Sequence, residues 1–164
     1  MMSFLFRVFL FGVACAGIGC QSASKPKDYK LTSARFFLEA GSGEGTAVTL
    51  PLSGVRVTVN SKPIITEGDI TDVQLVQVEL GKAIMFQLTP TASRDFYRLS
   101  GTHQGRRIVL VVDGEPLGAR RIDGAIMNGV VFVFVEMPEP AMAPFVENLK
   151  KSSVALQKEI ARKG

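Results

Sequence analysis

Histidine and cysteine are scarce in this chain, which limits the chemistry that its side chains can perform. The 164 residues include one histidine, His103, and two cysteines, Cys15 and Cys20. A zinc site needs about four nitrogen or sulfur ligands, and this set cannot supply them. His103 lies in a polar stretch between Gly101 and Gly105, with no carboxylate nearby in sequence, and is predicted to be a solvated loop residue. We therefore expect no catalytic residues, no metal, no cofactor and no enzymatic activity.

A strong charge excess and a second long apolar run are also missing. The net charge is +4, and removal of an N-terminal segment containing Arg7 lowers it to +3. So small and scattered an excess argues against nucleic-acid binding. Beyond the N-terminus, no apolar run reaches the ~20 residues that a membrane-spanning helix needs.

The first twenty residues have the pattern of an export signal. Arg7 is the only charged residue, and the apolar core 8–18 is too short for a permanent membrane span. Gly17-Ile18-Gly19-Cys20 resembles a bacterial lipobox, which implies a lipoprotein signal peptide over 1–19 and diacylation (palmitate-type chains) of Cys20. Three alternatives stay open: a competing site at Cys15, cleavage near Ala16 without lipidation, and an uncleaved anchor.

The remaining chain divides into a tether and one domain. Residues 20–32 are the lipidated cysteine and a polar, flexible tether, and residues 33–164 form a single domain. With Cys15 removed and Cys20 acylated, no free thiol would remain for a disulfide. The expected location is outside the cytoplasm, lipid-anchored to the cell membrane or outer membrane and facing the periplasm or the cell exterior.

Short strands outnumber helices in the pattern of the domain. Strands are predicted at 33–40, 46–52, 55–60, 73–80, 83–88 and 130–135, with the fourth and fifth joined as a hairpin around Gly81-Lys82. A helix over 139–162 follows, with one apolar stripe at 3-or-4 spacing: Met142, Phe145, Val146, Leu149, Ser153, Leu156 and Ile160. The predicted fold is α+β, a mostly antiparallel sheet with two helices on one face and additional N-terminal strands.

A strand–helix–strand–hairpin unit is marked at every junction between Phe86 and Gly129. Thr89-Pro90 is a helix start, and Gly101 is the expected stop. A buried strand over 106–112 leads into Asp113-Gly114, a strong signal for a two-residue hairpin turn.

That order of residues resembles the head subdomain in the first periplasmic region of SecD, a subunit of the SecDF protein-export translocase. The similarity covers residues 67–136 and departs from the family pattern at Arg120-Arg121, where a proline is usual. It implies a ferredoxin-like fold and a family that handles polypeptides emerging from the translocon. The matching positions are Phe86, Leu88, Thr89, Phe96, Leu99, Gly105, Arg107, Ile108, the run 109–112, Asp113, Gly114, Ala119, Ile122, Ile126 and Gly129.

Four arginines flank the predicted hairpin and suggest a binding face. A two-residue turn at Asp113-Gly114 predicts that Arg107 faces Arg120 and that Arg106 faces Arg121. Like charges placed opposite each other are unfavourable unless something neutralises them. Val109 and Val111 share a face with Arg107 and Arg120, which gives an apolar patch rimmed by guanidinium groups and suited to an acidic partner. Alternatively, strands from residues 33–60 cover this face, and Glu79 or Glu136 pairs with the arginines.

The leading functional hypothesis is a non-enzymatic envelope lipoprotein with a SecD-head-like binding module, accessory to protein export or polypeptide handling. Its partners would be the membrane, through the lipid, and a polypeptide or a translocon component. A structural or small-ligand-binding lipoprotein on the same fold is the alternative. A third class, an envelope hydrolase, would need a carboxylate or serine cluster assembled from distant residues.

Overall fold

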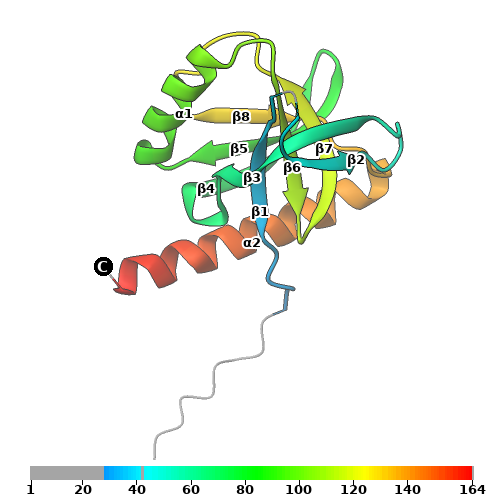
Figure 1. The fold of residues 1–164 in the computed structure, drawn as a ribbon. Coiled ribbons are helices and arrows are strands. Elements are labelled where there is room, and N and C mark those ends of the chain that lie inside the picture. Colours follow the sequence, from blue (N-terminus) through cyan, green and yellow to red (C-terminus); the bar gives the residue numbers. More distant parts are fainter. Residues whose placement is uncertain (1–27, 42, 164) are drawn as a thin grey trace, which may run out of the picture.

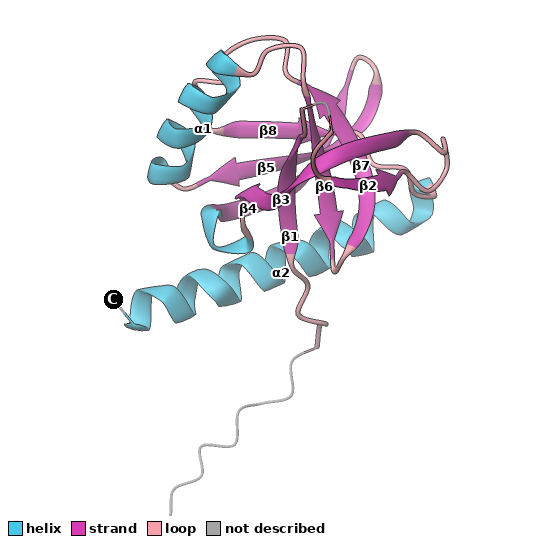
Figure 2. Ribbon diagram, in the orientation of Figure 1, coloured by secondary structure: helices cyan, strands magenta, loops and turns pink. Residues whose placement is uncertain are grey.

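A computed structural model describes residues 28–41 and 43–163, and it confirms the α+β class (Figures 1 and 2). Cys15, Cys20 and the predicted signal peptide lie outside the described residues. The elements, in chain order, are β1 (Ala34–Glu39), β2 (Thr46–Thr49), β3 (Arg56–Ile65), the 3-10 helix η1 (Glu67–Asp69), β4 (Ile70–Val78), β5 (Gly81–Leu88), α1 (Pro90–Thr102), β6 (Arg107–Val112), β7 (Glu115–Arg121), β8 (Val130–Val133) and α2 (Glu139–Lys163).

The strands form two antiparallel sheets rather than the single sheet that the sequence predicted. The five-stranded sheet has the order β2-β3-β1-β6-β7, and the three-stranded sheet has the order β4-β5-β8. An isolated bridge between Gly118 of β7 and Val135 brings them together. A Cβ at Gly118 would lie 2.2 Å from the carbonyl oxygen of Phe134, so only glycine permits this approach.

The main core fills the space between the two sheets, and both helices contribute to it. Phe36 of β1 and Phe86 of β5 meet edge to face, with ring centroids 5.0 Å apart. Phe96 of α1 and Leu149 of α2 are buried in the same cluster. Strands of both sheets and both helices therefore share one contiguous apolar core.

A second, smaller apolar cluster lies on the other face of the five-stranded sheet. Val109 of β6 is fully buried there beneath Leu50, Val57 and Val59, and Val111 packs against the same cluster. β3 reaches this position because it bends: register shifts interrupt its pairing with β1, and its first half pairs with β2.

The β6–β7 hairpin turns at Asp113-Gly114, as the sequence predicted. Both residues have positive φ, 50° and 92°, as a two-residue type I′ turn requires. A bulge between Leu110 and Val111 then shifts the register by one residue. Arg107 therefore faces Arg121 and Ile108 faces Arg120. The predicted pairings of Arg107 with Arg120 and of Arg106 with Arg121 are both wrong.

Helix α1 begins where expected and ends later. The Thr89 hydroxyl accepts a hydrogen bond from the Ala92 N–H at 3.3 Å, and Pro90 occupies the first turn. The predicted stop at Gly101 is wrong, because the helix runs to Thr102. His103 caps it: its backbone N–H donates to the Leu99 carbonyl at 3.0 Å.

The other junctions are close to prediction. The β4–β5 hairpin turns at Glu79-Leu80, just before the predicted Gly81-Lys82, because Val78 pairs directly with Gly81. Helix α2 spans Glu139–Lys163 and buries Met142, Val146 and Leu149 of the predicted stripe. Ile160, at the far end of that stripe, is 46% exposed.

Candidate functional site: an apolar groove beside Arg120

The predicted arginine-rimmed face is largely covered by the protein itself. Val109 has no exposed surface, and the Arg107 guanidinium binds Glu39 rather than Glu79 or Glu136. Glu39 accepts hydrogen bonds from the Arg107 backbone N–H at 2.8 Å, from Nε at 3.1 Å and from Nη2 at 2.5 Å. This favours the alternative in which residues 33–60 cover the patch.

The ion pair shifts the pKa of both of its members. Hydrogen bonds from Arg107 hold the pKa of Glu39 below its usual value, and the same contact raises the pKa of Arg107. Because the pair joins β1 to the first residue of β6, we assign Arg107 a structural role at that junction.

Arg120 lies elsewhere, and the register shift is the reason. A one-residue slip moves a side chain to the opposite face of a strand. Arg120 therefore points toward β8, where its Nη1 donates to the Phe132 carbonyl at 3.3 Å. Its guanidinium carbon also lies 5.9 Å from the centroid of the Phe132 ring, within range of a cation–π contact. Within residues 28–41 and 43–163, Arg120 is the one of the four arginines with a cation–π contact.

A shallow groove of about 440 Å³ runs past this contact. Leu80, at the tip of the β4–β5 hairpin, is 85% exposed, and Phe134, just after β8, is 40% exposed. Charged side chains of both signs lie along the edges of the groove, and apolar side chains form its floor. The lining residues are Val78, Glu79, Leu80, Arg120, Asp123, Phe132 and Phe134.

The alternation along residues 130–135 positions the aromatic side of this groove. Val131, Val133 and Val135 point into the core, so Val130, Phe132 and Phe134 take the outer face. The sequence signalled this face, because a strand that is apolar on both sides cannot leave its second side fully wet. It did not predict that Leu80 and Arg120 would meet there, since that depends on the shifted register and on the contact between the two sheets.

A separate cavity of about 250 Å³ lies between α2 and the chain leading into β1. Its walls include Ala34, Ile70, Leu149 and Leu156, so it is mainly apolar. Small-molecule sites usually measure about 300–1,000 Å³ and carry several converging polar groups. This cavity is smaller and is the weaker candidate for a binding site.

The titratable residues singled out by the sequence serve local structure in the described chain. His103 Nδ1 lies 2.9 Å from the Leu99 carbonyl oxygen, and Asp113 accepts a hydrogen bond from the Ser33 N–H at 2.8 Å. Asp69 closes a capping box with Thr66 around η1. Within residues 28–41 and 43–163, no group of three or more His, Cys, Asp or Glu side chains is placed to hold a metal ion.

Comparison with known proteins places the fold. Three of the solved structures that it resembles are of SecDF. One, described as a membrane component that enhances protein export, superimposes with a TM-score of 0.55 at 16% identity, over 77% of this chain and 62% of that one. SecDF in its super-membrane-facing form gives 0.54 at 17% identity, over 77% of this chain and 18% of the other.

The third structure is SecDF of Thermus thermophilus, a translocon-associated membrane protein. It gives a TM-score of 0.52 at 18% identity over 76% of this chain and 20% of that one. The chain shares its fold with part of SecDF. It spans less than two thirds of each of these relatives, and no family model and no curated protein matches its sequence. No helix in the described part of the chain is both long and apolar enough to cross a membrane.

Proposed function

We propose that this protein is a non-enzymatic, lipid-anchored envelope module that holds segments of unfolded polypeptide, accessory to protein export. The observation that carries the proposal is the apolar groove beside Arg120 on a fold shared with SecDF. An unfolded segment exposes apolar side chains together with charges of either sign. A groove with an apolar floor and edges formed by Arg120, Glu79 and Asp123 suits such a ligand without selecting one sequence.

Side-chain capture fits the groove better than addition of a strand to β8. Arg120 already occupies the carbonyl of Phe132, and Gly118 pairs with Val135 just beyond it. A polypeptide at this place would therefore lay its side chains on Leu80, Phe132 and Phe134 instead of extending the sheet by backbone hydrogen bonds.

Anchoring rests on the lipobox-like residues that end at Cys20. Diacylation there would hold the domain at a membrane without any spanning helix. Mass spectrometry of the protein isolated from its own cells tests this directly. We expect a mature N-terminus at Cys20 carrying acyl chains, and a Cys20→Ser variant that is recovered in the soluble fraction; a bare Cys20 would contradict the anchor.

Removal of the apolar groove contacts tests the binding function. We expect Leu80→Ser/Phe134→Ser to weaken binding of a fluorescently labelled, permanently unfolded polypeptide by at least about tenfold, because two exposed apolar contacts are lost. Fluorescence anisotropy with residues 21–164 measures the affinity, and thermal unfolding verifies the fold.

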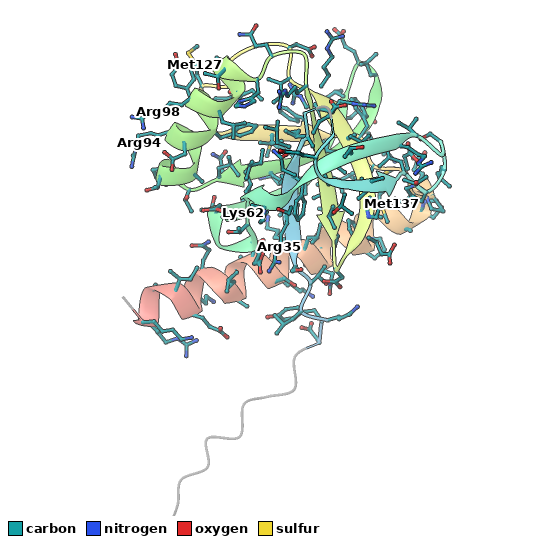
Figure 3. All side chains as sticks on the ribbon, viewed as in Figure 1. Arg35, Lys62, Arg94, Arg98, Met127 and Met137 are labelled. Atoms are coloured by element: carbon teal, nitrogen blue, oxygen red, sulfur yellow. The ribbon has the colours of Figure 1, made fainter. Side chains whose placement is uncertain are left out.

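Met127→Ser is the matched control. Met127 is 76% exposed, and Figure 3 places it beside α1. Met137, which follows Phe134 by three residues, lies on the opposite side of the domain in the same view. Equal losses in the control and the double variant, or no binding by the parent protein, would contradict the proposed function.

A further inference from the structure

The C-terminal half of α2 exposes an excess of positive charge. Between Glu147 and Lys163 the sequence contains five basic residues and two acidic ones. Lys150 pairs with Asp72 and Lys151 with Asp28, each at 3.2 Å. Lys158, Arg162 and Lys163 are exposed at the end of the helix.

An apolar side chain accompanies these charges on the outer surface of the helix. Val154 is 39% exposed and lies between Lys151 and Lys158, at the spacing of three and four that places residues on one helix face. Basic side chains next to apolar ones are the composition of helices that rest on an anionic lipid surface.

The chain enters the domain beside this helix. The Asn148 amide donates to the Lys30 carbonyl at 2.8 Å, and the Thr32 N–H donates to the Ser152 hydroxyl at 3.1 Å. Figure 1 shows the start of β1 reaching α2, whose C-terminal turns extend past the sheets. The eight Cα–Cα steps from Cys20 to Asp28 span at most about 28 Å. A lipid on Cys20 would therefore hold α2 close to the headgroups.

The positive charge of α2 and its position beside the chain entry favour an anionic membrane as the partner of this face. We propose that the outer face of α2, centred on Val154, Lys158 and Arg162, docks on an anionic phospholipid surface when the chain is tethered at Cys20. This inference rests on the lipid anchor of the proposed function, and it adds an orientation: α2 faces the membrane. Electrostatic attraction acts over about 8 Å at physiological salt, so the short tether is what brings the helix into range.

The sequence contains no tryptophan, which permits a clean reporter. Val154→Trp places a single tryptophan on the proposed face. Residues 20–164 would be coupled through Cys20, their only cysteine, to a maleimide lipid in vesicles that contain dansyl lipid. We expect strong energy transfer from the introduced indole to dansyl in phosphatidylglycerol-containing vesicles, falling to the level of phosphatidylcholine vesicles in high salt.

Charge reversals on the two helices separate docking from simple tethering. In the Val154→Trp background, Lys158→Glu/Arg162→Glu is expected to reduce the docked population at least about tenfold. Arg94→Glu/Arg98→Glu makes the same charge change on α1, where both side chains point outward (Figure 3), and is expected to leave the transfer unchanged. Met127→Trp, beside α1, should show weak transfer.

Three results would overturn docking: equal transfer in neutral vesicles, an equal effect of the α1 reversal, or stronger transfer from position 127. Each variant is first verified by its thermal unfolding. Because the coupling at Cys20 is installed chemically, the result stands whether or not cells acylate that residue. A bare Cys20 in cells would remove the anchor without removing the lipid affinity of α2.

Discussion

At the scale of single residues, the ion pair between Glu39 and Arg107 joins β1 to β6. The pKa of Glu39 is lowered in the folded protein, so the unfolded state binds more protons between the folded and the ordinary pKa. The stability that the pair contributes is fully present above about pH 4.5 and is lost as pH falls through the lowered pKa.

Glu39→Gln should therefore lower the free energy of unfolding by about 1 kcal/mol at pH 7, a value discounted for the partial exposure of both groups. Urea unfolding from pH 3 to pH 7 measures it, and the curves of parent and variant should converge at the acidic end. Glu44→Gln, an exposed change between β1 and β2, is the control. A constant gap between the curves at every pH would contradict this role.

Gly118 lies at the backbone bridge between the two sheets. Gly118→Ala would push a methyl group to within 2.2 Å of the Phe134 carbonyl oxygen, and we expect a loss of at least about 2 kcal/mol. Gly124→Ala, which meets nothing within 4 Å, is the matched control. Equal denaturation midpoints for the two variants would show that β7 and β8 can separate without cost.

At the scale of elements, Thr89 is the cap that starts α1. Thr89→Ala removes the acceptor of the Ala92 N–H and should cost about 1 kcal/mol. Thr91→Ala, two residues on and exposed, should change the stability little. Chemical denaturation of both variants measures the difference, and an equal effect would argue that the cap contributes nothing.

Local signals predicted the elements well and their mutual arrangement less well. Thr89-Pro90, Asp113-Gly114 and the alternation in β8 each act within a few residues, so the sequence was enough to find them. The bulge that adds one residue to β7 gives no such local signal. Its position depends on the contacts that β7 makes with other strands. That single residue moved Arg120 from the predicted patch to the groove.

The covering of Val109 is another tertiary effect that the sequence left undecided. Whether β3 bends over β6 depends on contacts between residues 50–59 and 109–111, far apart in the chain. The pattern of Val57 and Val59 showed a strand with one apolar face. It could not show which surface that face would meet.

At the scale of the whole molecule, the domain has a groove on one part of its surface and a basic helix beside the point where the chain enters. The fold is shared with part of SecDF, and the groove is where a client would bind under the proposed function. The helix would set the distance and orientation of that groove relative to the lipid.

Site-specific photocrosslinking in cells that are actively exporting proteins can show whether the groove contacts exported chains. A photoreactive amino acid at position 134 lies in the groove, and one at position 127 provides the control. We expect position 134 to yield adducts with exported polypeptides in an unfolded state, identified by mass spectrometry, and position 127 to yield few. Adducts of equal yield from both positions, or none with exported chains from position 134, would contradict it.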